Sequence, residues 1–185
     1  MPLRSKTRTA SREVKRLDLD GLLGYSARVL AARTQTVSEL RRKLTRKAAL
    51  VSDVDEVIVR LKENGYLNDQ RFAESFAGWR RDNEGFGKDR VIRDLVARQV
   101  AVETAKRATE KAYAAADEME MIGQFLERKY RGKNLAVLFQ EDKHLASAYR
   151  RLRTAGFSSS NSVRALKQFA SGTRDLDSME DIENA

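Results

Sequence analysis

The sequence predicts an all-α protein built from three tandem three-helix repeats that stack into an elongated, curved rod. Pro2 is the single proline among 185 residues, so nothing after it forces a helix to break. Apolar residues recur at helical spacing through most of the chain, and helix stop and start signals separate these stripes. Because a small helical unit cannot bury its apolar faces alone, successive units are expected to stack.

The first expected repeat covers residues 21–67. Leu22 and Leu30 belong to an apolar stripe that predicts the first helix. Thr36 and Glu39 have the spacing of a capping box, which predicts the start of a second helix. The third helix carries the clearest periodicity, at i, i+3, i+4 and i+7. Its apolar residues are Val54, Val57, Ile58 and Leu61.

A helix stop and a helix start lie close together at the end of this repeat. Gly65 suits the left-handed position after a helix, and Tyr66 is expected to fold back onto that helix. Asn68 or Asp69 then caps the next helix. The short joint predicts that the two flanking helices pack closely.

The second expected repeat covers residues 68–116. Phe72, Phe76 and Trp79 follow one another at helical spacing, so we expect them on a buried face. Residues 83–87 read as a loop, and Leu95 belongs to the helix that follows it. A further helix is expected from about Val102.

The third expected repeat covers residues 117–171. Asp117 opens its first helix, and a later helix stops at Gly156, after which residues 158–161 cap the last one. Residues 131–141 are open to two interpretations, a short helix or a buried loop. The repeat pattern is clearest in the middle helices, where Leu44, Leu95 and Leu152 occupy similar places.

The charge distribution favours a polyanionic partner. The formal net charge is +9, and two oppositely charged tails flank the folded part. Residues 1–20 are expected to form a flexible basic arm, and residues 172–185 a flexible acidic tail. A folded region that remains strongly basic between them is typical of proteins that bind nucleic acid or a protein that carries it.

Several classes of function are disfavoured by composition. The chain has no cysteine, so thiolate catalysis, disulfides and zinc–thiolate sites are not expected, and a cytoplasmic location is. His144 is the only histidine, which argues against a transition-metal site. There is no signal-peptide pattern and no apolar stretch long enough for a membrane span. We expect no enzyme activity, no catalytic residues, no metal and no cofactor.

Two local patterns have simple structural interpretations. Gly85, Gly87 and Lys88 suggest a phosphate loop, but Asp82 and Asp89 stand where a Walker A motif needs glycine and a hydroxyl residue. The glycines are therefore expected to permit a turn. Aromatic residues near Arg80 and Arg81 could stack on bases, although the spacing of Phe72, Phe76 and Trp79 favours core positions and leaves Phe86 freer in its loop.

Ten basic residues are the candidates for partner binding. The first five crowd one helix without interleaved acids, which costs stability through like-charge repulsion and so indicates a use. The simpler alternative is a solvated helix face. The candidates are Arg41, Arg42, Lys43, Arg46, Lys47, Arg80, Arg81, Lys88, Arg90 and Arg93.

Three stretches, residues 38–44 (SELRRKL), 65–73 (GYLNDQRFA) and 87–95 (GKDRVIRDL), resemble the successive signatures of the RecX family of bacterial regulators. The resemblance covers about residues 22–171, and residues 150–157 (RRLRTAGF) also fit it. It implies a fold of three tandem three-helix repeats. It also implies a monomeric, non-enzymatic protein that binds the RecA filament on single-stranded DNA and restrains ATP hydrolysis, filament growth and strand exchange. Such a protein modulates recombination, DNA repair and the SOS response.

Two other functions stay open at this point. A basic second helix in a helix pair could act as a helix-turn-helix that binds duplex DNA independently of RecA. A general helical scaffold is the third possibility. Binding to RecA with and without single-stranded DNA separates these alternatives.

Overall fold

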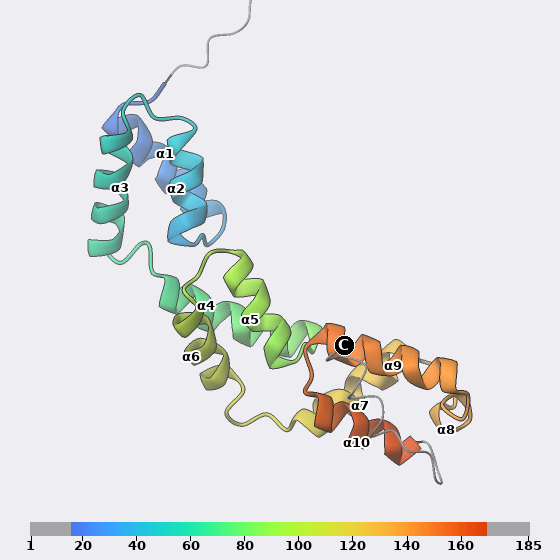
Figure 1. The fold of residues 1–185 in the computed structure, drawn as a ribbon. Coiled ribbons are helices and arrows are strands. Elements are labelled where there is room, and N and C mark those ends of the chain that lie inside the picture. The colour runs from blue at the N-terminus through green and yellow to red at the C-terminus, as the bar shows by residue number, and fades with distance from the viewer. Residues whose placement is uncertain (1–15, 170–185) are drawn as a thin grey trace, which may run out of the picture. The chain divides into compact units, whose positions relative to one another are not determined.

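A computed structural model describes residues 16–169, and most of these residues lie in helices (Figure 1). The prediction of an all-α fold is confirmed: among the described residues the only extended pairing is an isolated bridge between Leu17 and Ala48. The chain divides into two compact units, with the division between Leu67 and Asn68.

The first unit contains α1 (Leu19–Ala32), α2 (Val37–Thr45) and α3 (Val51–Glu63). The capping box is present, because the Thr36 hydroxyl accepts from the Glu39 N–H and the Glu39 carboxylate accepts from the Thr36 N–H. The helices enclose one apolar core. Its fully buried members include Leu22, Leu40, Leu44, Val54 and Val57.

The expected basic arm lies outside the described residues except for its last part. Leu17 exchanges backbone hydrogen bonds with the segment after α2: its N–H donates to the Lys47 carbonyl and its carbonyl accepts from Ala49. The first helix then begins at Leu19. Residues 17–20 therefore belong to the first unit, which corrects the expected boundary at residue 20. The acidic tail lies wholly outside the described residues.

The end of α3 has the expected glycine, but a different residue folds back. Gly65 has a φ of +71°, in the left-handed region that favours glycine. The N–H of Leu67 donates to the Leu61 carbonyl at 3.1 Å, and Leu67 is buried in the core. Tyr66 is 71% exposed, so the expectation that it packs onto α3 is wrong. Leu67, and not Tyr66, is therefore the residue that packs back against the core of the first unit.

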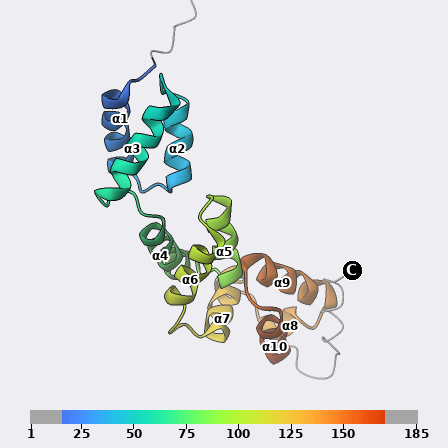
Figure 2. The same ribbon diagram turned by 60° about the vertical axis from the view of Figure 1, so that its left-hand side comes forward.

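The second unit contains the remaining helices, and α4 packs closely against α6 (Figure 1 and Figure 2). Two apolar clusters form its interior, one around Leu95 and Ala105, the other around Leu126 and Leu152. The elements are α4 (Asp69–Trp79), the π-helical turn η1 (Arg80–Glu84), α5 (Lys88–Ala97), α6 (Val102–Ala112), α7 (Glu118–Lys129), α8 (Leu135–Leu138), α9 (Asp142–Ala155) and α10 (Ser159–Phe169). The grouping of helices into three repeats and the rod shape stay predictions.

The helix caps expected in the second unit are present, and one expected loop is partly helical. Asn68 is the residue that caps α4, since its side chain accepts from the Arg71 N–H at 2.9 Å. The uncertain stretch 131–141 contains a short helix, α8, which Asn134 caps. Asp117 caps α7 as expected. Asn83 and Glu84, the first two residues of the segment read as a loop before α5, belong instead to the π-helical turn η1, which continues directly from α4; residues 85–87 form the loop.

Two aromatic residues differ from the sequence interpretation. Trp79 is 53% exposed, so it is not part of the buried face that Phe72 occupies. Phe86, expected to be free in a loop, packs against both apolar clusters of the unit. The buried Tyr113 hydroxyl also donates to the Phe86 carbonyl at 2.5 Å, and burial raises the pKa of this tyrosine. Phe86 is therefore partly buried between the two clusters, while Trp79 faces outward.

Two glycines form a close backbone contact between the start of α5 and the end of α9. Gly87 donates its N–H to the Ala155 carbonyl at 2.9 Å, and Asp89 donates to the Gly156 carbonyl at 3.2 Å. A Cβ on Gly87 would lie 2.1 Å from the Gly156 carbonyl oxygen. Gly87 has an ordinary extended conformation, with a φ of −74°. It therefore serves close approach and not, as the sequence suggested, a turn.

Candidate polyanion-binding surfaces

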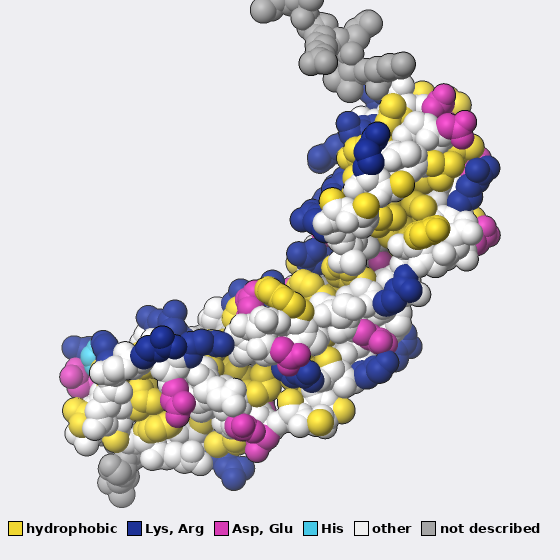
Figure 3. Space-filling model, turned by 180° about the vertical axis from the view of Figure 1, so that it is seen from behind, with side chains coloured by type: hydrophobic (Ala, Val, Ile, Leu, Met, Phe, Trp, Pro, Cys, Tyr) yellow, Lys and Arg dark blue, Asp and Glu magenta, His cyan; other side chains and the backbone are white. Residues whose placement is uncertain are grey.

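The five basic residues predicted in the first unit lie on or just after α2. We call them the α2 basic face: Arg41, Arg42, Lys43, Arg46 and Lys47. Lys and Arg side chains line the side of the first unit on which α2 lies (Figure 3). This gathering follows from the local sequence, because Leu40 and Leu44 turn inward and leave the intervening positions outside.

Only part of the α2 basic face is unpaired. Arg41 forms an ion pair with Asp55 of α3. Lys43 donates to the side-chain carbonyl of the buried Gln35 at 2.6 Å, and the Lys47 ammonium lies 5.0 Å from the centre of the Tyr25 ring. Arg42 and Arg46 are exposed, and within the described part of the chain neither has a carboxylate at ion-pair distance. These two arginines are the cations most available to a partner.

The second predicted cluster is mostly engaged within the protein. Arg80 pairs with Glu84 at 2.7 Å and Asp94 at 3.0 Å, and Arg81 pairs with Asp82 at 2.6 Å. Lys88 pairs with Glu110 at 2.8 Å. Arg90 and Arg93 both donate to the Thr154 carbonyl, at 3.5 and 3.3 Å. The five residues are therefore engaged by groups within the second unit and do not form one free basic patch.

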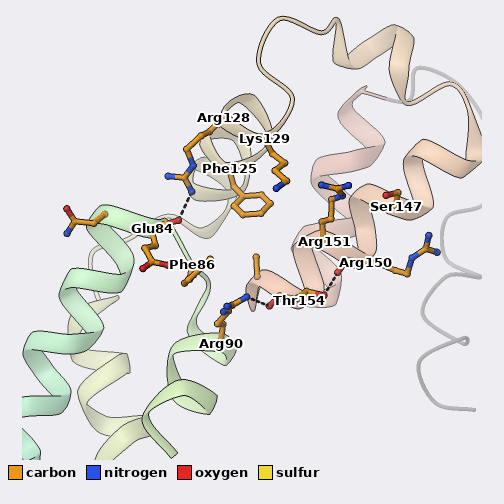
Figure 4. Close-up of a pocket in the computed structure, with 12 residues that line it drawn as sticks. Glu84, Phe86, Arg90, Phe125, Arg128, Lys129, Ser147, Arg150, Arg151 and Thr154 are labelled. Atoms are coloured by element: carbon orange, nitrogen blue, oxygen red, sulfur yellow. Dashed lines mark hydrogen bonds between the residues drawn. The ribbon is translucent and has the colours of Figure 1, made fainter. Parts of the chain in front are cut away.

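A hollow in the second unit gathers a different set of cations. It has a volume of about 610 Å³ and lies between η1, the start of α5, α7 and α9 (Figure 4). We call it the basic groove. Five basic side chains line it, whereas Glu84 is the single acid in its lining and is already paired with Arg80. The five are Arg90, Arg128, Lys129, Arg150 and Arg151.

The basic groove is partly preorganised. The Arg128 guanidinium donates to the Glu84 carbonyl, and Arg90 stacks over the Phe86 ring with its guanidinium carbon 4.2 Å from the ring centre (Figure 4). Lys129 and Arg151 extend into the hollow from opposite sides. Lys129 and Arg150 have no carboxylate partner in the structure as described. A site with several fixed cations and little negative charge suits phosphates or carboxylates.

Sequence reasoning missed four of these five cations, and a signal for them existed. Arg128-Lys129 and Arg150-Arg151 are adjacent basic pairs on two different helices. The two pairs come together because α7 contacts η1 and α9 contacts the start of α5, and spacing along the chain does not reveal these contacts. Of the ten predicted residues, Arg90 alone lines the groove.

Residues 16–169 hold no cluster of three or more potential metal ligands, and their helices are too short or too polar to cross a membrane. His144 lies 3.6 Å from Glu141 at the start of α9. The arrangement as a whole supports binding of an anionic partner.

Several known proteins similar to this chain share one description. The chain is 34% identical over 105 residues to the "Regulatory protein RecX" of Trichlorobacter lovleyi, covering 57% of this chain and 68% of that protein. It is 31% identical over 169 residues to the protein of the same description from Deinococcus radiodurans, covering 91% and 74%. No family model matches the sequence.

The fold also has solved counterparts. A crystal structure of RecX from Lactobacillus salivarius superposes with a TM-score of 0.63 at 16% identity, over 82% of this chain and 96% of that one. A second crystal structure, described as the regulatory protein RecX, gives a TM-score of 0.63 at 17% identity. At these identities the likeness concerns the fold alone.

Proposed function

Because this chain belongs to the RecX family of regulatory proteins, we propose that it binds the RecA filament on single-stranded DNA and restrains its ATP hydrolysis, growth and strand exchange. The protein acts without catalysing a reaction of its own. Through the filament it modulates recombination, DNA repair and the SOS response. It acts in the cytoplasm as a monomer.

The supporting observation is the presence of exposed cations that the fold itself does not use. Arg42 and Arg46 of the α2 basic face, and Lys129 and Arg150 of the basic groove, have no carboxylate partner among residues 16–169. Unpaired like charges on one helix lower its stability, so their retention favours a role in binding. A nucleoprotein filament offers phosphates and acidic protein patches, and both attract such cations.

Replacing Arg42 and Arg46 together with alanine is expected to weaken binding to the RecA–DNA filament about tenfold. The fold is expected to survive, since both side chains are exposed and alanine has a high helix propensity. If each arginine contacts a phosphate, the slope of log affinity against log salt falls by about 1 per residue. Lys43 is left in place because its removal would leave the buried Gln35 carbonyl without this donor. The measurement is filament affinity over a range of salt concentrations.

A matched variant with Arg60 and Lys62 replaced by alanine serves as the control, because it removes the same charge from exposed positions of α3. Circular dichroism confirms folding of both variants. If the α2 variant is folded and binds like the control, the α2 basic face is an ordinary solvated surface. A preference of the wild-type protein for duplex DNA over the filament would instead support the helix-turn-helix alternative.

A further inference from the structure

The exposed tryptophan adjoins the basic groove. Asn83, which lines the groove, lies one helical turn after Trp79 and donates to its carbonyl at 3.1 Å. The Arg80 guanidinium carbon lies 5.9 Å from the centre of the Trp79 ring and 5.4 Å from that of Phe86, which is in the groove wall. One arginine thus bridges the exposed ring and the groove.

The core of the second unit does not explain the position of Trp79. The residue is 53% exposed, whereas Phe72 on the same helix is buried. A large aromatic ring left in solvent beside a group of cations is the combination that single-strand binders use. In those proteins cations follow the phosphates, and aromatic rings stack on the bases in a way that tolerates any sequence.

We propose that the basic groove and Trp79 together form a direct binding site for single-stranded nucleic acid. Lys129, Arg150 and Arg151 contact the phosphates, and a base next to them stacks on the Trp79 ring. This inference assigns the DNA contact to the second unit. Its role in the cell rests on the proposed function.

Size and chemistry favour a single strand over other anions. A hollow of about 610 Å³ lies within the range of small-ligand sites, ~300–1,000 Å³, and has room for one or two nucleotides. Bases in a duplex are also stacked on one another and cannot cover an outside ring. An acidic peptide would use the cations but would leave Trp79 without a role.

The test uses the full chain without RecA. Trp79 is the only tryptophan, so its fluorescence reports on this site alone. A short deoxythymidine oligonucleotide is expected to quench it in a saturable manner, and a hairpin duplex and polyglutamate are expected to quench it far less. Lys129→Ala with Arg151→Ala should weaken oligonucleotide affinity at least about tenfold and reduce the salt slope by about 1.4 for two lost phosphate contacts.

Two further variants complete the experiment. Arg131→Ala with Lys133→Ala removes the same charge from exposed positions outside the groove lining and is expected to bind as wild type does. Trp79→Ala, followed by anisotropy of a labelled oligonucleotide, is expected to lose about tenfold in affinity, the scale of one stacked base.

The inference is overturned if the oligonucleotide fails to bind or to quench, if polyglutamate binds equally well, or if the groove variant matches its control. Because RecA is absent, the two proposals can fail separately. Restraint of the RecA ATPase without oligonucleotide binding would remove this site and leave the proposed function standing. Oligonucleotide binding without an effect on RecA would contradict the proposed function and leave this site standing.

Discussion

Replacing Gly87 with alanine is expected to destabilise the second unit by at least about 3 kcal/mol. The new Cβ would lie 2.1 Å from the Gly156 carbonyl oxygen and 2.6 Å from the Phe157 nitrogen, both backbone atoms. Overpacking of this kind costs about 1–3 kcal/mol. Separation of the two segments would also break the hydrogen bonds that Gly87 and Asp89 donate to Ala155 and Gly156, at about 1 kcal/mol each. Urea denaturation measures the loss.

Gly78→Ala is the matched control. Gly78 lies within α4, and a Cβ built there has no neighbour within 4 Å. Because alanine is favoured over glycine inside a helix, this variant is expected to gain about 0.5–1 kcal/mol. Equal stability of the Gly87 variant and wild type would show that the start of α5 and the end of α9 are not in backbone contact.

Replacing Glu118 with alanine is expected to cost about 3 kcal/mol, because it removes the acceptor for three hydrogen bonds. The Glu118 carboxylate in the first turn of α7 accepts from the N–H and hydroxyl of Ser158, both at 2.7 Å, and from the Asn161 amide at 2.5 Å. These donors lie at the start of α10. Each unsatisfied buried donor costs about 1–3 kcal/mol, and partial exposure places this site at the lower end.

Glu118 also makes stability depend on pH. Burial alone would raise the pKa of Glu118, but the hydrogen bonds from Ser158 and Asn161 outweigh it, and the pKa is lowered. The stabilising contribution is therefore complete above the unfolded pKa of about 4.3 and is lost as the pH falls through the lower folded value. A Glu118→Gln variant is expected to lose less stability than wild type on acidification below about pH 4.

Glu120→Ala is the control for both measurements. Glu120 lies in the same first turn of α7 and is exposed, and its one partner among residues 16–169 is Gln124, which donates to it at 3.1 Å. Comparison with this variant separates the specific effect of Glu118 from the stabilisation that any acid gives at the start of a helix. If the two alanine variants unfold at the same urea concentration, the carboxylate of Glu118 does not hold α7 to α10.

Local sequence rules predicted the helix ends well. The capping box at Thr36 and Glu39, the left-handed Gly65 and the cap at Asn68 all appear in the structure. Each of these signals depends on residues within one or two turns, so it can be read without the tertiary fold. The leucines at positions 44, 95 and 152 could likewise be placed from local periodicity, and all three are fully buried.

Features that depend on contacts between helices were not predictable in the same way. Helical spacing could not show that Trp79 lies outward, because spacing identifies one face of a helix and does not show how much of that face another element covers. Charge counting identified Arg80, Arg81 and Lys88 as basic but could not reveal that Glu84, Asp82 and Glu110 pair with them. The basic groove escaped prediction for the same reason: its cations come from three helices that meet only in the folded chain.

The central claim is that this protein restrains RecA, and one measurement tests it most directly. The rate of DNA-dependent ATP hydrolysis by the cognate RecA on single-stranded DNA is followed while the protein is added from well below the RecA concentration upward. The account predicts that hydrolysis falls at substoichiometric amounts, because one regulator bound to a filament affects more than one RecA subunit. An unchanged rate in the presence of a many-fold excess of folded protein would contradict it.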